Sequence, residues 1–278
     1  VRYWVKDVLT NVEGVITKDL SSFVYDKNTY YDMALNMNLK DYKTTRCYWD
    51  AQADYWVGHE WNAANPADRW QPVITAKPFP HYDELKKPVT PPRAANLSFP
   101  GLGVRNDAVN LCKDCPNVNE LVWYAEKGDP RFDADILWTC MGHLRKGGIW
   151  LKKKAKIASD NGKTISDIEN KAPDNTDWRI TTSALASNQK STNLTPPSSG
   201  DINDYFFLPA LGSANDDPSG KIFSMTGQMA SFWSSSGVLN NIDVFALVYY
   251  INSNNELELS IASTVNRELN IMNAWKFE

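Results

Sequence analysis

The sequence predicts an α+β fold in which helices pack against an antiparallel sheet. Two observations predict this class: two segments with helical patterns lie within residues 117–145, and five strand-like segments follow after residue 204. No internal repeat or low-complexity region interrupts that order. Helices followed by a run of strands are typical of an α+β domain, because the helices then cover the antiparallel sheet.

The N-terminal part differs from the rest in its residue types. Residues 1–61 alternate in polarity and are rich in Tyr, Val, Trp and Thr, which favours strands and ordered aromatic loops. Eight of the fifteen prolines then fall within residues 66–100, so this stretch is predicted to be extended. We therefore predict an aromatic-rich segment with a proline-rich connector over residues 1–100, packed on a domain over residues 101–278.

The predicted helices have different sequence support. In the first, Asn117 can cap the start, Glu120 stands at capping-box spacing and Gly128 ends the helix. The second is predicted over residues 133–145, because five apolar residues there would share one helical face. These are Ile136, Leu137, Cys140, Met141 and Leu144.

Later elements are read from shorter patterns. The lysine-rich residues 152–156 are predicted to be a solvated basic edge, and Thr164 with Asp167 has capping-box spacing for a further helical turn. Five strands are then predicted from apolar or alternating runs. Their sequences are "YFFLPAL", "SFWSSS", "DVFALVYYI", "ELELSIA" and "LNIMNAWKF".

Charge and hydropathy exclude two classes of partner. The net charge of -4 gives no reason to expect nucleic acid. The longest apolar run, over residues 244–251, is too short to cross a bilayer, so no transmembrane segment is predicted in this chain. The sequence starts at Val1 without a signal peptide, so we expect a mature or trimmed piece of a longer protein.

The four cysteines raise the question of a metal site. Cys112 and Cys115 form a Cys-x2-Cys pair, and Cys140 with His143 forms a Cys-x2-His pair, a set that resembles a zinc ribbon. The alternative is that Cys140 is a small buried residue, while Cys112 and Cys115 are free or paired. We favour the alternative, and because the acidic loops lack EF-hand spacing we predict no metal and no other cofactor.

Most catalytic motifs are missing from the sequence. The serines at 234–236 lack the G-x-S-x-G arrangement, and the three histidines show no partner pattern. A metalloprotease helix would need histidine at position 63, which is Ala63. A glycosidase needs two carboxylates in a groove, and 33 acidic residues neither supply nor exclude that pair.

Several fragments occur in the order found in one family. They are "DWRITTSA", "YFFLPALG", "FWSSS" and the closing "AWKFE". Together they resemble the W-R-L-P-T, L-P-A-x-G and Y-W-S-S-T pattern of the C-type-lectin-like domains of Bacteroidetes surface proteins. Upstream fragments are similar to the variant at the C-terminus of fimbrillin-like lipoproteins and fimbrial tip proteins, and the likeness spans residues 40–278.

The resemblance implies a C-type-lectin-like domain with two helices, a small antiparallel sheet and long irregular loops. It also implies export to the outer membrane or a fimbrium and a role in cell adhesion without catalysis. It does not imply calcium-bridged carbohydrate binding. The position of the W-N-D motif reads Trp233-Ser234-Ser235, and neither E-P-N nor Q-P-D occurs in the sequence. Formylglycine-generating oxidases share this broad fold, but here the pair Cys112 and Cys115 precedes a helix instead of lining a late loop.

The predicted ligand-binding residues lie on one strand and two polar loops beside it. Trp233 and Ser235 would form a glycan platform, and the alternative is that Trp233 is a buried core residue. The loops span residues 213–219 and 240–243, and loops on a rigid scaffold concentrate binding residues. Their candidates are Asn215, Asp216, Asp217, Asn240, Asn241 and Asp243. Residues 48–62, rich in aromatic and acidic side chains, are a third candidate, for which we favour a structural role.

These observations lead us to expect a non-catalytic binding module of the cell surface, the adhesive part of a fimbrial tip or surface lipoprotein. Its partner would be a glycan or a protein on a host cell or neighbouring bacterium, with other fimbrial subunits as further partners. Two alternatives stay open: a structural pilin-like subunit that assembles through its aromatic face, and a formylglycine-type or carbohydrate-active enzyme.

Overall fold

Strands dominate the fold. The computed structural model describes residues 1–19, 21–22, 24, 26–30, 37–43, 45–71, 90–95, 101–182, 185, 187–214 and 223–278. This part of the chain contains thirteen strands and three α-helices. The prediction of an α+β fold with two helices and a small sheet is therefore wrong, and the fold is β-rich.

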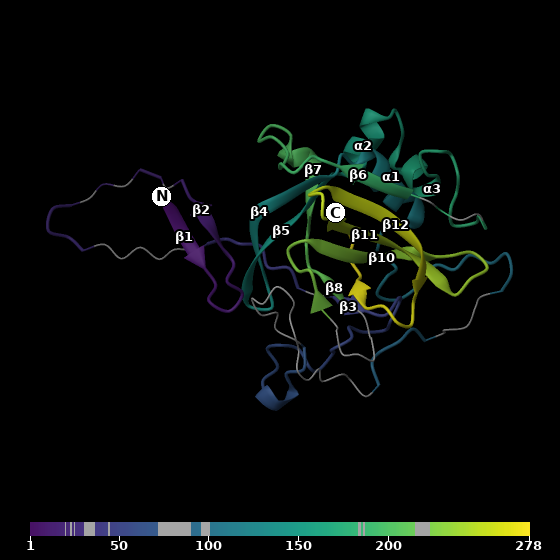
Figure 1. Cartoon of the computed structure of the whole chain (residues 1–278), viewed down its shortest axis with the longest axis horizontal. Helices are drawn as coiled ribbons and strands as arrows, with labels where there is room; N and C mark the ends of the chain where they lie inside the picture. The colour runs from purple at the N-terminus through teal and green to yellow at the C-terminus, as the bar shows by residue number, and fades with distance from the viewer. Residues whose placement is uncertain are drawn as a thin grey trace.

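The largest sheet has six strands and forms the centre of the molecule (Figure 1). Its order is β3 (Arg46–Cys47), β13 (Met272–Asn273), β10 (Met229–Gly237), β11 (Asp243–Ile251), β12 (Leu257–Asn266) and β6 (Ser187–Ser191). All neighbours pair antiparallel except β10 and β13, which are parallel. Three predicted strands are confirmed as β10, β11 and β12, whereas the closing segment forms only the short β13.

A second sheet replaces the predicted second helix. It consists of β4 (Arg131–Cys140), β5 (His143–Lys152) and β7 (Tyr205–Pro209), in that order and antiparallel. The chain reverses at Met141 and Gly142, whose φ angles of 52° and 76° are typical of a tight hairpin turn. The prediction of a helix over residues 133–145 is wrong because short apolar runs on either side of a turn can imitate helical spacing.

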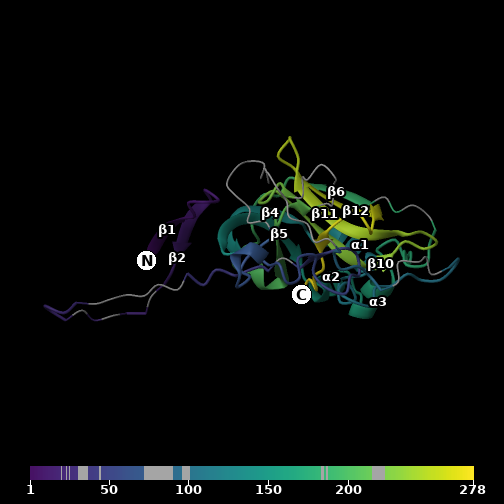
Figure 2. The same ribbon diagram turned by 90° about the horizontal axis from the view of Figure 1, so that it is seen from below.

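Three α-helices lie together on one face of the six-stranded sheet (Figures 1 and 2). α1 (Val118–Lys127) is confirmed as predicted, with a capping box between Asn117 and Glu120 and Gly128 at its end. α2 (Lys154–Asp160) begins within residues 152–156, which were predicted as a basic edge, and α3 (Ile165–Asn170) begins with the predicted capping box. In the described part of the chain, no helix combines the length and the apolar character needed to cross a bilayer.

Short elements complete the chain. Two 3-10 turns, η1 (Pro66–Asp68) and η2 (Ile202–Asp204), lie in connections, and β8 (Ser213–Ala214) pairs with β9 (Phe223–Ser224).

Apolar side chains cover both faces of the six-stranded sheet. Phe232 of β10 and Leu247 of β11 pack on the face that carries α1. Trp233 and Ala246, their neighbours on the same strands, pack on the opposite face with aromatic residues of the N-terminal segment. Because successive strand residues point to opposite faces, burial on both sides accounts for the uninterrupted apolar runs of β10 and β11.

A hairpin of β1 (Arg2–Lys6) and β2 (Glu13–Thr17) projects from the body (Figures 1 and 2). Asp7 connects it to the start of β5. Its carboxylate accepts the backbone N–H of Leu144 at 2.9 Å and contacts Nδ1 of His143 at 3.1 Å. Thr10 Oγ1 also donates to the carbonyl of Leu144 at 2.9 Å, so the hairpin is held at its turn while Trp4 on its outer face is 64% exposed.

Candidate functional site

A cavity of about 280 Å³ opens between residues 41–71 and the turn that joins β4 to β5. We call it the Trp61 cavity. Its lining residues are Asp41, Lys43, Thr45, Arg46, Asp54, Trp56, Glu60, Trp61, Asn62, Gln71 and Met141. Indole rings and a thioether thus meet carboxylates and side-chain amides in one place, which is the usual composition of a small-ligand pocket.

The segment that carries the cavity is fixed to the central sheet by two indole hydrogen bonds. Nε1 of Trp233 donates to the carbonyl of Cys47 at 2.8 Å, and Nε1 of Trp49 donates to the carbonyl of Ser234 at 2.8 Å. These bonds satisfy polar atoms that are buried with the rings, so they connect residues 47–49 firmly to β10.

Trp61 is held from two sides. Its backbone N–H donates to Oε1 of Gln71 at 3.1 Å, and its ring lies against Gly142. A Cβ at Gly142 would stand 2.7 Å from that ring, and the φ of 76° there also favours glycine. Nearby, the imidazole of His59 stacks on the indole of Trp70 with ring centroids 3.5 Å apart. Trp61 therefore offers a preformed flat surface that is half-buried.

Carboxylates outnumber cations in the Trp61 cavity. Asp41, Asp54 and Glu60 face two cationic residues, Lys43 and Arg46. Burial and the negative charge of Glu60 raise the pKa of Asp54 to about 6. No hydrogen bond to the Asp54 carboxylate is found within the described residues. A carboxylate with a raised pKa in a cavity is typical of a functional site, because a bound ligand can stabilise the ionised form that burial destabilises.

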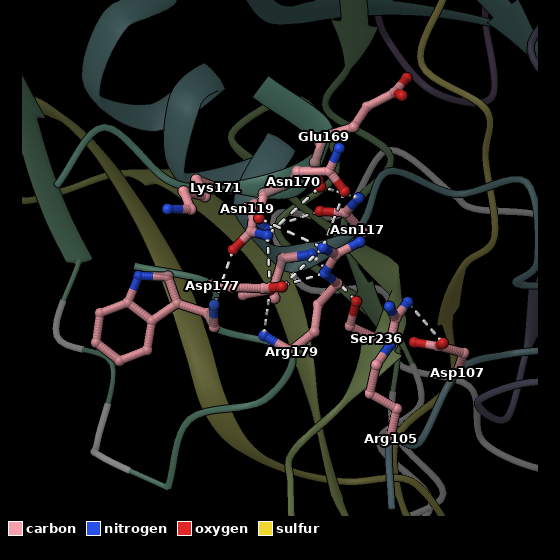
Figure 3. Close-up of polar contacts among 12 residues, drawn as sticks. Arg105, Asp107, Asn117, Asn119, Glu169, Asn170, Lys171, Asp177, Arg179 and Ser236 are labelled. Atoms are coloured by element: carbon pink, nitrogen blue, oxygen red, sulfur yellow. Dashed lines mark hydrogen bonds and ion pairs between the residues drawn. The ribbon is translucent and has the colours of Figure 1, made fainter. Parts of the chain in front are cut away.

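A second partly buried carboxylate lies in a polar cluster whose groups satisfy one another (Figure 3). Asp177 accepts hydrogen bonds from Nε and Nη2 of Arg179, both at 2.7 Å, and from Nδ2 of Asn119 at 2.9 Å. Although burial opposes ionisation, these hydrogen bonds lower the pKa of Asp177 to about 2. Asp177, Arg179 and Asn119, the Asp177 cluster, connect α1 to the chain after α3 and form a structural brace.

The predicted platform on β10 is mostly buried. The indole of Trp233 has no exposed surface, and its N–H is bonded to the carbonyl of Cys47. Ser235 is half-buried, and its backbone bonds the carbonyl of Pro116 and the N–H of Ala108. Neither residue lines the Trp61 cavity.

The predicted loop residues divide into two groups. Asn215, Asp216 and Asp217 lie outside the described residues. In the turn before β11, Oδ1 of Asn240 accepts the backbone N–H of Gly103 at 2.7 Å, and Nδ2 of Asn241 donates to Asp243 at 3.1 Å. Asn240 thus joins the turn to Gly103, Asn241 and Asp243 stabilise the turn itself, and none of the three lines the Trp61 cavity.

The four residues that resemble a zinc ribbon do not lie together in the structure. His143 is bonded to Asp7, whereas Cys112 lies beside Cys115 and Cys47. Across the residues that the structure describes, no group of three or more His, Cys, Asp or Glu side chains is arranged to hold a metal ion.

Part of the Trp61 cavity was within reach of sequence reasoning. Asp54, Trp56, Glu60 and Trp61 all belong to the aromatic and acidic stretch 48–62, and the density of both residue types was the available signal. Sequence reasoning missed Asp41, Lys43 and Met141, which reach the cavity from other parts of the fold. Comparisons with known protein families, curated proteins and solved structures find no match for this chain.

Proposed function

We propose that this chain is a non-catalytic binding module of the cell surface, the adhesive part of a fimbrial tip or outer-membrane lipoprotein, and that it binds a glycan in the Trp61 cavity. The observation that carries the proposal is that the half-buried Trp61 lines one cavity together with three carboxylates and the amides of Asn62 and Gln71. Aromatic rings present flat apolar area to the carbon face of a sugar, and the polar groups fix its orientation.

The cavity volume limits the size of the bound unit. About 280 Å³ lies just below the range of roughly 300–1,000 Å³ that is common for ligand pockets. We therefore expect one sugar residue inside, with the remainder of a longer glycan outside. The excess of carboxylates disfavours an acidic sugar and favours a neutral or amino sugar, since like charges repel.

A glycan array with the purified chain tests the proposal. We expect binding that survives EDTA and that falls at least tenfold in Trp61→Ala. Trp4→Ala is the matched control, because it removes a 64% exposed indole far from the cavity lining and should leave binding unchanged. Binding that is equal in wild type and Trp61→Ala, or an array without any binding, would contradict the proposal.

Asp54 adds a pH signature to the same site. Sugar hydroxyls donate best to an ionised carboxylate, so affinity should rise as pH increases through about 6, where Asp54 ionises. Between pH 5 and 7 the ionised fraction of such a group changes about tenfold. Titration calorimetry should show this rise for the wild type and its absence for Asp54→Asn.

An assembly role has support from the projecting hairpin. Trp4 of β1 lies opposite Val15 of β2, and these side chains are 64% and 49% exposed. An apolar pair on an exposed face favours a structural subunit that contacts a neighbour. An array without binding, together with self-association that Trp4→Ala abolishes, would favour this second function.

The non-catalytic part of the proposal can be tested on the same samples. Asp54 and Glu60 both line the cavity, and two carboxylates are what a glycoside hydrolase requires. Release of reducing ends from a bound glycan by the wild type, lost in Glu60→Gln, would show that the module is an enzyme. We expect no release.

A further inference from the structure

Three thiols lie together in the hydrophobic cluster that contains the aromatic residues of the N-terminal segment. Cys47 and Cys112 are fully buried, and Cys115 is 6% exposed. The thiol of Cys112 contacts those of both Cys115 and Cys47 within one hydrophobic cluster. All are reduced in this structure.

Backbone geometry selects one pair among the three. The N–H of Cys115 donates to the carbonyl of Cys112 at 3.1 Å, which closes a four-residue turn. The ends of such a turn have Cα atoms within about 7 Å, and disulfides span Cα distances of about 4.4–6.8 Å. Cys47 belongs to a separate strand, β3, so the turn favours a bond between Cys112 and Cys115.

Access also distinguishes Cys115. It lines a cavity of about 200 Å³, the Cys115 cavity, to which Cys112 and Cys47 do not contribute. The charged lining residues are four carboxylates and two amines: Asp114, Glu120, Glu169, Glu278, Lys154 and Lys276. A small reagent in this cavity meets Cys115 first, and the excess of carboxylates favours a cationic one.

We propose that Cys112 and Cys115 are a thiol–disulfide exchange pair that reacts with small cationic disulfides entering the Cys115 cavity. The Cys115 thiolate attacks one sulfur of the disulfide RSSR, which forms a mixed disulfide and releases one RSH. The Cys112 thiolate then attacks the Cys115 sulfur, closes the intrachain bond and releases the second RSH. The chain loses two hydrogen atoms and the small disulfide gains two.

The pair is protected by its surroundings at neutral pH. Burial raises the pKa of the Cys112 thiol, and contact with Cys112 together with burial raises the pKa of the Cys115 thiol. The thiolate is the nucleophile, so the exchange rate should increase about tenfold per pH unit below those pKa values.

The bond would act on residues 47–51, which lie between lining residues Arg46 and Asp54 of the Trp61 cavity. Sγ of Cys112 accepts the backbone N–H of Asp50 at 3.2 Å, and the Asp50 carboxylate accepts the N–H of Asn110 at 2.6 Å. Residues 47–51 are therefore fastened to the turn that the disulfide would close. This inference stands independently of the proposed glycan site.

Peptide mapping after oxidation with cystamine at pH 8.5 tests the pair. Trypsin cuts after Arg105, Lys113 and Lys127, so Cys112 and Cys115 fall on peptides 106–113 and 114–127. Cys47 falls on a third peptide, 47–69. We expect the first two peptides to remain joined without reductant and to separate with it, while 47–69 stays unlinked.

Variants establish the order of the two steps. Cys112→Ser should stop at a mixed disulfide on Cys115, and Cys115→Ser or Cys115→Ala should not react. Cys140→Ser, which removes a buried thiol that has no thiol contact, should react like the wild type. We also compare cystamine with oxidised glutathione, which is anionic, and divide each rate for the folded chain by the rate for the urea-unfolded chain. This ratio should be larger for cystamine.

Three results would overturn the proposal. They are linkage of peptide 47–69 to either partner, a folded chain that stays reduced while the unfolded chain oxidises, and a Cys112→Ser variant that carries no mixed disulfide. The first would assign the exchange to Cys47, and the other two would assign the three thiols to core packing alone.

Discussion

Asp54 and Asp177 are both partly buried carboxylates, yet their pKa values shift in opposite directions, to about 6 and about 2. Asp177 is bonded by Arg179 and Asn119, whereas Asp54 faces Glu60 across an open cavity. The first carboxylate is paired inside the fold and stabilises it. The second is ionised at a cost to the fold, which a ligand can recover. The difference separates a carboxylate that braces the fold from one that we propose contacts a ligand.

Removal of the paired carboxylate should have the largest effect. In Asp177→Ala, the Arg179 guanidinium loses its paired carboxylate, and the amide of the buried Asn119 loses one of its acceptors. We expect the free energy of unfolding to fall by about 2–3 kcal/mol, measured by urea denaturation. Asp135→Ala is the control, because that side chain is 95% exposed and its loss should change stability by less than about 0.5 kcal/mol. Equal losses of stability in Asp177→Ala and Asp135→Ala would show that Asp177 contributes no more than an exposed surface carboxylate.

Neutralising the cavity carboxylate should act in the opposite direction. The folded-state pKa of Asp54, about 6, lies above its ordinary value of 3.8, so the folded chain binds more protons than the unfolded chain between these values. Wild-type stability therefore increases as pH falls from 7 to 4 through this group. Asp54→Asn should be more stable than the wild type at pH 7 by about 1 kcal/mol, after allowance for partial solvent exposure, and should lack this pH dependence.

The contributions of Asp54 and Asp177 to stability also change in different pH ranges. The pKa of Asp177 lies below its ordinary value, so its stabilisation is complete above pH 3.8 and is lost as pH falls towards 2. Urea curves at pH 7, 4 and 2.5 should show the Asp54 gain before the Asp177 loss. If Asp54→Asn were less stable than the wild type at pH 7, Asp54 would stabilise the fold as Asp177 does.

The support of Trp61 can be tested at Gly142. Gly142→Ala places a Cβ 2.7 Å from the Trp61 ring at a φ of 76°, so we expect a loss of about 1–2 kcal/mol together with weaker glycan binding. Gly58→Ala is the matched control, since its φ of 78° is similar but no atom lies within 4 Å of the added Cβ. If both variants bind equally, contact with Gly142 does not position Trp61.

The smallest global effect is expected at the projecting hairpin. Burial opposes ionisation of Asp7, but backbone N–H bonds from Thr10 and Leu144 and the contact with His143 lower its pKa to about 2. Asp7→Asn weakens these bonds at one end of the molecule only, so the global free energy should change by less than about 1 kcal/mol. Tryptic cleavage at Lys6 and Lys18 should accelerate several-fold, and an unchanged cleavage rate would show that Asp7 does not hold the hairpin.

Local signals in the sequence were sufficient where local chemistry decides the structure. The caps Asn117 and Thr164 pair with Glu120 and Asp167 three residues later, and both boxes form as predicted. The fold class failed because residues 133–145 carry apolar spacing that fits a helix, whereas they form parts of two strands that pair with each other across the turn at Met141 and Gly142. Apolar spacing alone does not distinguish such a hairpin from a helix.

The site was predictable only in part, for the same reason. The aromatic residues of 48–62 were given a structural role, and Tyr48 and Trp49 do fill the core, but Asp54 and Trp61 of the same stretch line the cavity. Alternation of buried and cavity-facing residues in an irregular loop has no fixed period. The positions of Met141 and Gly142 opposite Trp61 depend on the hairpin that the sequence did not reveal.

The place of β13 in the large sheet determines when the fold can be completed. β3 reaches that sheet through Met272 and Asn273, which stand between it and Phe232 of β10. Pairings so distant along the chain form late, because the intervening loop must close first. Synthesis must therefore reach Met272 and Asn273 before Arg46 and Cys47 gain their strand partner. A chain shortened before Met272 lacks that partner, and with it the strand pairing of Arg46, which lines the Trp61 cavity.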